Sequence, residues 1–319
     1  MNARKVITPK STKRTIVVAE AQAAGKPWGL TFLFEHSMAG HSISVFEATF
    51  GQVKIHQQVG DIIRRFSTNR DNIYQLALSN TNVQEPTNIL DIGCGYGRFT
   101  GYLDQVVKMP ATCTGIDIVE NNRKPYLQVA RKAGLTGQFI CGPATIVNSF
   151  PDRSYQLIIA GYSLNFFYNI IPHLPRILDK NGWFITINHS KQFLAELIED
   201  IKSAWRKSFQ DQYEEVDFQQ LVASFNAENG YELLESHFDV IEKIDYKNKL
   251  NFTYVNIDQC LIYTDFKLPM MMPHKLSEKD EEYVLFKHNL HQIIKYKVKV
   301  RKIYTLNKDD CIFRCRCPK

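Results

Sequence analysis

Three alternate glycines and two carboxylates mark the part of this sequence where chemistry is most concentrated. Gly93, Gly95 and Gly97 lie in the stretch NILDIGCGYGRFTG, which begins like a buried strand and ends like a helix. Glycine at such a bend permits positive φ and lets backbone amides approach a ligand without an intervening Cβ. Asp91 precedes the first glycine, and Asp117 stands near the end of the next apolar run. The pattern is typical of a loop that binds a nucleotide-like cofactor.

The residues around the glycines discriminate between cofactors. Arg98 stands where a dinucleotide fingerprint needs its third glycine, and its side chain would obstruct a pyrophosphate. Asp91 would repel a pyrophosphate but suits an ammonium group, and Asp117 can accept both hydroxyls of a ribose. An amine together with a ribose indicates an aminoacyl nucleoside. S-adenosylmethionine carries both, with a sulfonium charge that a carboxylate-lined crevice tolerates.

Short apolar runs alternate with helical periodicity from residue 88 onward. The predicted strands are 88–93, 113–118, 138–142, 155–162 and 183–189, and the predicted helices lie near 98–108, 121–133, after Asn165 and at 190–206. Nearly continuous apolar strands indicate burial on both faces, and their alternation with helices indicates right-handed crossovers. The sequence therefore predicts an α/β fold with a doubly wound, mainly parallel, seven-stranded Rossmann-like sheet.

The remaining segments are expected to surround this sheet. Residues 1–20 are polar and basic and predict a flexible tail, 21–85 predict N-terminal cap helices, and 86–319 predict the main domain with a lid insertion at about 206–295 before the last strand. Within these ranges, helices are expected at 52–66, after residue 72 and at 277–294, and a strand at 238–246. Residues 256–266 are ambiguous. The C-terminal runs VRKIYTL and CIFRCRC predict two strands around the turn NKDD.

These motifs resemble the class I S-adenosylmethionine-dependent methyltransferases of small-molecule type. LDIGCGYGRFT is similar to their first motif, GIDI to their second-strand acidic motif, and the resemblance covers about residues 88–190. It implies that Asp91 holds the amino group of the cofactor, Asp117 the ribose, and that Ile118 packs on adenine. Pro143 stands where family members often place an acidic residue. The implied cofactor site comprises Asp91, Gly93, Cys94, Gly95, Gly97, Asp117, Ile118, Gly142, Pro143 and Ala144.

Candidate catalytic residues follow the fourth and fifth predicted strands. Methyl transfer from a sulfonium is an in-line displacement, so the protein must align a nucleophile and, where needed, remove its proton. His189 is the candidate general base, since imidazole titrates near neutral pH; an equal alternative is that it caps the following helix. Tyr162 is a second candidate for catalysis or for lining the site, and Asn165 and Phe166 are candidates for substrate binding.

The terminal cysteines raise the question of a metal. Cys311, Cys315 and Cys317 supply only three soft ligands, whereas a structural zinc site uses four, so no metal site is expected. In a strand these cysteines share one face with Phe313, and a buried strand face is the favoured interpretation. The seven scattered cysteines do not form a disulfide framework, which favours reduced thiols and a cytoplasmic location. No apolar run is long enough to cross a membrane.

The sequence thus predicts a methyltransferase that uses S-adenosylmethionine and acts on an oxygen, nitrogen or carbon atom of a small molecule. The formal net charge of +6 does not favour nucleic acid as a partner. Two alternatives stay open: an RNA or protein methyltransferase, and a non-catalytic cofactor-binding subunit. A nicotinamide oxidoreductase ranks third. The sequence leaves the oligomeric state open.

Overall fold

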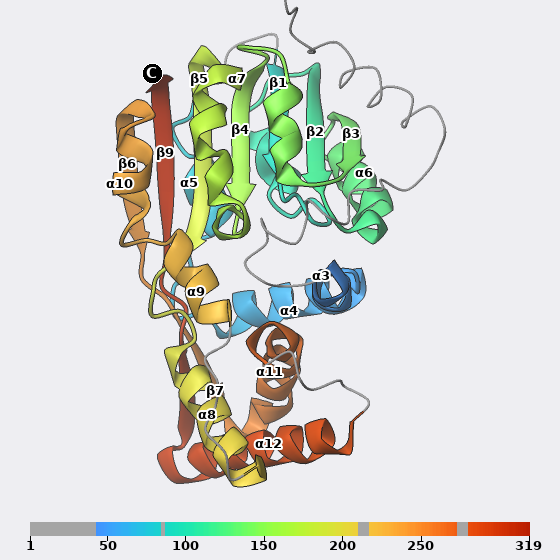
Figure 1. Cartoon of the computed structure of the whole chain (residues 1–319), viewed down its shortest axis with the longest axis vertical. Helices are drawn as coiled ribbons and strands as arrows, with labels where there is room; N and C mark the ends of the chain where they lie inside the picture. Colours follow the sequence, from blue (N-terminus) through green and yellow to red (C-terminus); the bar gives the residue numbers. More distant parts are fainter. Residues whose placement is uncertain (1–42, 84–86, 210–216, 273–279) are drawn as a thin grey trace, which may run out of the picture.

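A seven-stranded sheet forms the upper part of the molecule (Figure 1). The computed structural model describes residues 43–83, 87–209, 217–272 and 280–319, so the tail expected at 1–20 lies outside the described residues. The strand order is β3-β2-β1-β4-β5-β9-β6. The strands are β1 (Thr87–Ile92), β2 (Ala111–Asp117), β3 (Thr136–Cys141), β4 (Tyr155–Gly161), β5 (Leu178–His189), β6 (Phe238–Tyr246) and β9 (Asp310–Pro318).

The pairing of these strands confirms the predicted doubly wound, mainly parallel sheet. β1 runs parallel to β2 and β4, and β5 runs parallel to β4, while β9 is antiparallel to both β5 and β6. Ile89, Leu90 and Ile92 are fully buried, as expected for a strand covered on both faces. β5 begins five residues before the predicted start at 183, because Leu178 already pairs with Tyr155 ahead of a bulge.

Helices cover both faces of the sheet, and several of them are short. The predicted helix at 98–108 is only the 3₁₀ turn Thr100–Gln105, and Gly101 within it is a poor helix former. The predicted helix at 121–133 corresponds to α6 (Arg123–Lys132) after a short turn. The other elements that cover the sheet are α5 (Ile73–Leu78), η3 (Ala144–Ser149), η4 (Leu164–Phe166), η5 (Tyr168–His173), α7 (Leu174–Ile177) and α10 (Gly230–Glu235).

A second layer lies below the carboxyl ends of β1, β4 and β5 (Figure 1). It contains α4, which confirms the helix predicted at 52–66, and α11, which settles the ambiguous segment 256–266 as helical. Its elements are α3 (Ile43–Phe50), α4 (Val53–Phe66), α8 (Ala195–Phe209), α9 (Asp217–Ser224), α11 (Ile257–Met271), α12 (Glu281–Arg301), β7 (Lys249–Thr253) and β8 (Ile303–Asn307).

Two segments of the chain are arranged differently from expectation. The range 206–295 is not one continuous insertion over the site, because β6 within it is the edge strand of the main sheet. The two C-terminal strands exist as β8 and β9, but β8 does not pair with β9; it pairs with β7 in a separate two-stranded sheet. There Leu250, Phe252 and Leu306 are fully buried, and this burial holds β8 in the lower layer.

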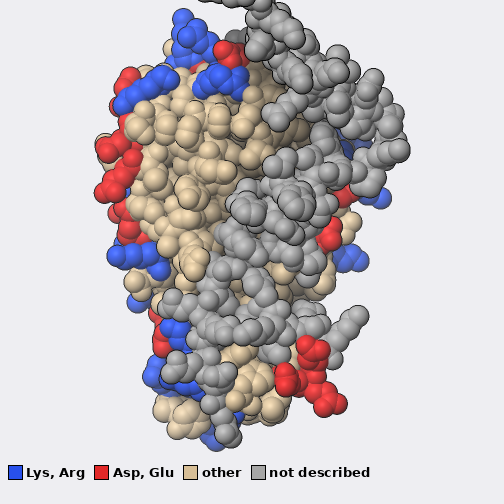
Figure 2. Space-filling view, viewed as in Figure 1, with Lys and Arg blue, Asp and Glu red and all other residues tan. Residues whose placement is uncertain are grey.

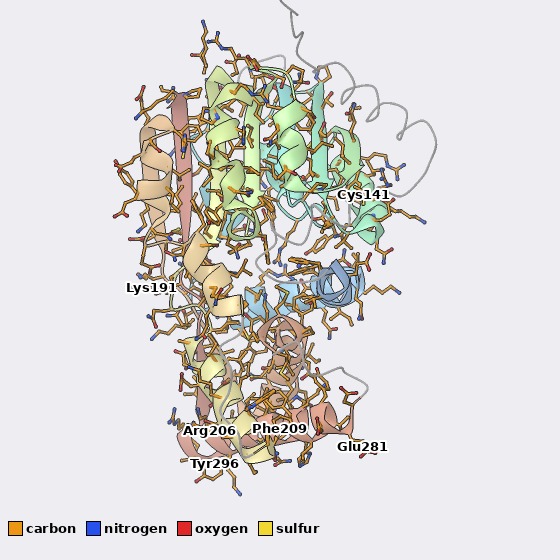
Figure 3. The ribbon with its side chains drawn as sticks, in the orientation of Figure 1. Cys141, Lys191, Arg206, Phe209, Glu281 and Tyr296 are labelled. Carbon is orange, nitrogen blue, oxygen red and sulfur yellow. The ribbon has the colours of Figure 1, made fainter. Side chains whose placement is uncertain are left out.

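Buried polar contacts tie the lower layer together. Asp200 of α8 accepts hydrogen bonds from Lys297 of α12 and, at 2.7 Å, from the hydroxyl of Tyr304 in β8. Phe209 packs against Trp205 at the same end of α8 and against Phe286 of α12, and Figure 3 shows Phe209 at the lower end of the molecule. These contacts join α8, α12 and β8 beneath α11.

The C-terminal strand buries its cysteines in the sheet. Cys311, Phe313 and Cys315 have no exposed surface, whereas Cys317 is exposed and adopts a φ of 53°, so it leaves the predicted face. All seven cysteines are free. Among the described residues no group of three or more His, Cys, Asp or Glu is arranged to hold a metal ion, and none of the helices there is long and apolar enough to span a membrane.

Candidate functional site

The glycine loop after β1 has the backbone geometry that its sequence predicts. Gly93, Gly95 and Gly97 have φ values of 69°, 51° and 89°. A Cβ at Gly93 would stand 2.4 Å from the Cβ of Ser163, and one at Gly97 would press on Tyr126, but a Cβ at Gly95 would meet no atom within 4 Å. The first and third glycines therefore permit close packing, while Gly95 faces open space.

That open space is a cavity of about 270 Å³ between the carboxyl ends of the strands and the lower layer. Of the fourteen residues predicted for the site, all but Gly97 line it; Gly97 lies behind the loop against α6. The predicted residues on its wall are Asp91, Gly93, Cys94, Gly95, Asp117, Ile118, Gly142, Pro143, Ala144, Tyr162, Asn165, Phe166 and His189.

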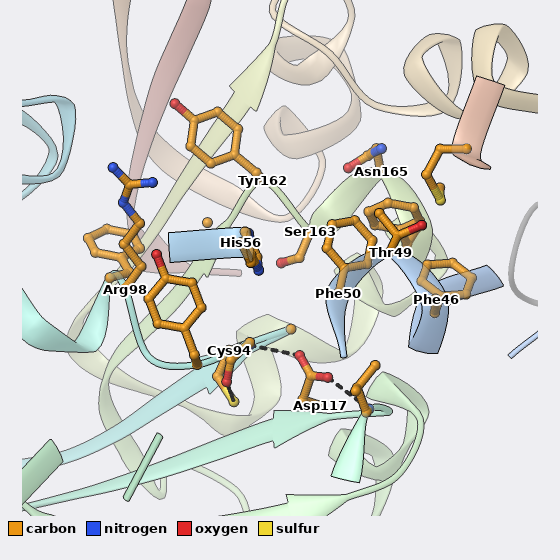
Figure 4. Close-up of a pocket in the computed structure, with 18 of the residues that line it drawn as sticks. Phe46, Thr49, Phe50, His56, Cys94, Arg98, Asp117, Tyr162, Ser163 and Asn165 are labelled. Carbon is orange, nitrogen blue, oxygen red and sulfur yellow. Dashed lines mark hydrogen bonds between the residues drawn. The ribbon is translucent and has the colours of Figure 1, made fainter. Parts of the chain in front are cut away.

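Asp117 sits at the floor of the cavity, beside the glycine loop (Figure 4). Its Oδ2 accepts a hydrogen bond from the backbone N–H of Gly95 at 2.7 Å, and its Oδ1 accepts one from Val119 at 2.8 Å. Burial raises the pKa of this carboxyl, although the two backbone bonds act in the opposite direction. Oδ1 also accepts a hydrogen bond from Nδ2 of Asn122 at 3.3 Å. A carboxylate offers about four acceptor sites, so the site that stays available for a ligand's hydroxyl group is on Oδ2.

Asp91 lies deeper, with 1% of its surface exposed. It accepts a hydrogen bond from the hydroxyl of Thr100 at 2.6 Å. No described Lys, Arg or His forms an ion pair with Asp91 or with Asp117. Burial raises the pKa of Asp91 to about 7. A buried carboxyl without a cation is costly to ionise, so this position favours a positively charged ligand.

The opposite end of the floor is apolar and open. Ile118, Pro143 and Ala144 line it, and a Cβ at Gly142 would meet no atom within 4 Å. The backbone N–H of Gly142 donates to the carbonyl oxygen of Asp117 at 3.0 Å, which holds the ends of β2 and β3 together. The space suits a flat ring sandwiched between Ile118 and the 142–144 backbone.

His189 reaches the cavity from the end of β5. Its Nδ1 lies 2.7 Å from Oδ1 of Asp310, and its ring stacks on Phe193 at 3.5 Å between centroids. Burial and then the charge of Lys308 lower the pKa of His189 to about 3, so the ring is neutral. With a carboxylate at Nδ1, that nitrogen carries the proton and Nε2 presents a lone pair. The next helix begins at Ala195, so His189 does not cap it.

Asp310 joins three side chains at the roof of the cavity. Its Oδ2 accepts hydrogen bonds from the hydroxyl of Tyr162 at 2.8 Å and from Nζ of Lys308 at 2.5 Å, in addition to the contact with His189. Burial by itself raises the pKa of Asp310, but Lys308 and His189 outweigh it, and the pKa lies below its ordinary value. Tyr162, whose own pKa burial raises well above its ordinary value, thus serves as a hydrogen-bond donor.

Sequence reasoning missed Asp310 and Lys308. Both belong to the run NKDD, which it treated only as a turn. The position of NKDD could have indicated a site, because polar residues directly before a buried strand lie at the edge of the sheet where that strand begins. Since β9 is antiparallel to β5, the beginning of β9 meets the carboxyl end of β5, and His189 pairs with Asp310 across the sheet.

The walls contributed by the lower layer were also missed. On α4, His56, Val59, Gly60 and Ile63 share one face at helical spacing and line the cavity. Phe166 meets Phe46 of α3 edge-on at 5.1 Å, so η4 and α3 form one aromatic wall. Other wall residues that the sequence did not single out for the site include Thr49, Phe50, Tyr74, Tyr96, Phe193, Phe218, Phe266, Lys267 and Met270.

Arg98 points toward α4 across the left side of the cavity as drawn in Figure 4. Its Nη2 donates to the carbonyl oxygen of Gly60 at 3.2 Å, and its guanidinium lies 5.5 Å from the ring centre of Tyr74. A Cβ at Gly60 would stand 2.2 Å from Nη1 of Arg98. Because Gly60 has no side chain, the guanidinium of Arg98 fits between α4 and the glycine loop.

Comparison with known proteins gives a partial match in sequence. Residues 90–186 match a family model described as a methyltransferase domain. The chain is 24% identical over 112 residues to the demethylmenaquinone methyltransferase of Listeria welshimeri, a match that covers 34% of this chain and 48% of that protein. The same protein of Listeria monocytogenes is also 24% identical over 112 residues, with 34% and 47% covered. The chain thus spans about half the length of the curated relatives it matches.

Comparison of structures gives matches of low sequence identity. One is with a putative methyltransferase of Bacillus halodurans, at a TM-score of 0.46 and 14% identity, covering 77% of this chain and 99% of that one. Another is with phosphoethanolamine N-methyltransferase 2 of Haemonchus contortus in complex with S-adenosyl-L-methionine, at a TM-score of 0.42 and 16% identity, covering 92% and 61%.

Proposed function

From the match of residues 90–186 to a methyltransferase domain, we propose that this chain is a class I methyltransferase that moves a methyl group from S-adenosylmethionine to a small molecule. The acceptor atom that the site favours is a hydroxyl oxygen. One observation carries the proposal: the glycine loop with Asp117 and the neutral His189, held by Asp310, face the same enclosed cavity. A cofactor site and a base thus share one space.

The residues present fit the cofactor. Asp117 would accept a ribose hydroxyl through Oδ2, and the apolar end near Ile118 and Gly142 would take adenine. Asp91 would hold the ammonium group of the cofactor, which would supply the cationic partner that this buried carboxyl does not have among the described residues. Arg98, beside the same loop, would face the carboxylate of the methionyl part. When bound, S-adenosylmethionine supplies an activated methyl group on a sulfonium.

Residues of this chain would then prepare the acceptor. A hydroxyl group becomes a strong nucleophile when it loses its proton, and Nε2 of His189 presents a lone pair to receive that proton. Asp310 fixes the ring through Nδ1 and offsets part of the effect of burial and of Lys308, which together hold the pKa of His189 low. Tyr162 and Lys308 hold Asp310 in turn, so they act as positioning residues. The surrounding aromatic walls exclude water from the reacting atoms.

We infer a small acceptor from the volume of the cavity, about 270 Å³, and from its position between the sheet and the lower layer. On the face drawn in Figure 2, the described residues have basic and acidic side chains interspersed along the edges and form no broad basic surface of the kind that binds nucleic acid. We also propose a cytoplasmic location, which the seven free thiols support. The oligomeric state stays open.

A labelled-methyl assay with the purified chain tests the proposal. The protein is incubated with methyl-labelled S-adenosylmethionine and a panel of small hydroxyl, amine and carbon acceptors, and the labelled product is identified. We expect transfer to a hydroxyl, and we expect His189→Gln to lower kcat by roughly 10²–10⁴-fold, the range for removal of a general base.

Cofactor binding, measured by calorimetric titration, separates the two parts of the proposal. His189→Gln should bind the cofactor as the wild type does, whereas Asp117→Asn should bind it at least about tenfold more weakly, since a charged acceptor is lost. A chain that does not bind S-adenosylmethionine would overturn the proposed function. Full activity of His189→Gln would remove His189 from the mechanism.

A further inference from the structure

We propose that Lys267 binds a carboxylate of the methyl acceptor, so that the substrate is a hydroxylated, ring-containing carboxylic acid. The inference rests on the proposed function and specifies its substrate class. Lys267 lies on α11 and lines the cavity, yet neither the glycine loop nor the His189–Asp310 pair uses it.

The surroundings of Lys267 are aromatic rather than acidic. Its Nζ lies 5.4 Å from the ring centre of Phe266 and 5.7 Å from that of Phe193. Within the described part of the chain, no Asp or Glu forms an ion pair with it. Burial, followed by the charge of Lys308, lowers the pKa of Lys267 to about 8. The ammonium group of Lys267 is half-buried among aromatic rings and has no ion-pair partner there. A bound anion would therefore stabilise it.

The acidic side chains closest to Lys267 in the sequence and in the cavity already form ion pairs with other cations. Asp310 receives Lys308, His189 and the hydroxyl of Tyr162, and Asp265 on the outer side of α11 pairs with Lys287 and His291. Lys308 pairs directly with Asp310, which also acts on Lys267 from a greater distance, so Lys267 adds one positive charge that has no ion-pair partner among the described residues. A singly charged carboxylate matches that charge better than a doubly charged phosphate.

The cofactor has a different cation for its own carboxylate. Its methionyl end would lie along the glycine loop, where Arg98 projects toward Gly60 and Tyr74. Lys267 instead contacts Phe193, a residue beyond the end of β5. The two cations thus contact different residues, although both lie close enough to His56 to lower its pKa, and we assign Lys267 to the acceptor.

Phe193 links the anion site to the base. One contact of its ring is the stack with His189 at 3.5 Å, and another is with Nζ of Lys267. An acceptor that bridges them carries its hydroxyl at His189 and its carboxylate at Lys267. The wall between these points is apolar, with Phe218, Leu221, Val222, Phe266 and Met270 along it. This wall favours a flat or ring-shaped body.

The test measures ligand preference in the wild type and in Lys267→Met. The protein is first saturated with S-adenosylhomocysteine, and binding of 4-hydroxybenzoate, its methyl ester and phenyl phosphate is then measured by calorimetric titration. We expect the wild type to prefer the free acid over the ester by at least tenfold, and Lys267→Met to lose this preference. Lys267→Arg should retain it in part. The control is Lys295→Met, which removes an exposed lysine of α12 outside the cavity.

The measurements distinguish failure of the inference from failure of the proposed function. Absence of S-adenosylhomocysteine binding in the wild type would defeat the proposed function. If that binding is intact but the acid and ester bind alike, or Lys267→Met leaves the preference unchanged, the inference is overturned. Stronger binding of phenyl phosphate than of the acid would also overturn the carboxylate assignment. Weaker S-adenosylhomocysteine binding in Lys267→Met would reassign this lysine to the cofactor.

Folding of the variant supplies an independent check. Removing an uncompensated, desolvated charge relieves a cost in the unliganded protein, so Lys267→Met should melt at the same temperature as the wild type or higher. A markedly lower melting temperature would show that a protein group neutralises Lys267, and the inference would fail.

Discussion

Asp91 shows at the scale of one residue how burial prepares a group for a cation. It is fully enclosed, its hydrogen bond comes from the neutral hydroxyl of Thr100, and its pKa is raised to about 7. In the free protein the carboxyl is therefore partly protonated near neutral pH. An ammonium ligand needs the ionised form, so binding must expel that proton as the pH falls below 7.

The first prediction concerns the pH dependence of cofactor binding. As the pH rises from about 5.5 to about 7.5, Asp91 ionises while an α-amino group stays largely protonated, so affinity for S-adenosylmethionine should increase on the order of tenfold. Calorimetric titration at several pH values measures it. Asp91→Asn should bind more weakly and with a flat profile. An equally steep profile in Asp91→Asn would assign the titration to another group.

At the scale of elements, the glycine loop and α4 are coupled through Arg98. The loop can receive the helix closely because Gly60 has no side chain where the guanidinium lies. Gly60 is in the interior of α4, where alanine would favour the helix by about 1 kcal/mol. Helix propensity therefore favours alanine at position 60, whereas the guanidinium of Arg98 requires glycine there.

The second prediction uses that conflict. Gly60→Ala should leave the free energy of unfolding unchanged or raise it by up to about 1 kcal/mol, but weaken cofactor binding several-fold, because the new methyl group displaces the guanidinium. Urea denaturation and calorimetric titration measure the two effects. In an Arg98→Ala background, Gly60→Ala should cause no further loss of affinity. An additive loss would show that the methyl group acts through some other contact.

At the scale of the whole molecule, the cavity exists because two layers meet. The sheet supplies the acids, the glycine loop and His189, whereas α4 and α11 supply the opposite wall. Asp200 is central to the support beneath α11: it is 1% exposed and holds α12 through Lys297 and β8 through Tyr304. Removal of one member of such a cluster leaves buried polar partners unsatisfied.

The third prediction is that Asp200→Ala lowers the free energy of unfolding by roughly 2–3 kcal/mol. Lys202→Ala on the same helix is the control, since its pair with Glu199 is largely exposed and should change stability by less than about 1 kcal/mol. Urea denaturation monitored by circular dichroism measures both. Equal effects of the two substitutions would mean that the buried cluster adds nothing beyond a surface ion pair.

The sheet was predictable because its signals are local. Strands β1 to β4 read as apolar runs of the correct length, and the glycines and Asp117 follow from the spacing around β1 and β2. Parallel strands joined by helices bring their carboxyl ends to one edge, so the neighbours of Gly95 were implied by topology alone. His189 was a candidate for the same reason.

What the sequence alone determined is the layout of the glycine loop. What the tertiary structure decided is the side of the cavity that we assign to the acceptor. Asp310 becomes the partner of His189 only because β9 returns antiparallel to β5, and nothing local to NKDD states where that strand inserts. Lys267 reaches the cavity only because α11 packs below the sheet. Such contacts join residues more than a hundred positions apart or depend on which face of a helix is covered. Long-range packing sets them, and no short stretch of sequence encodes it.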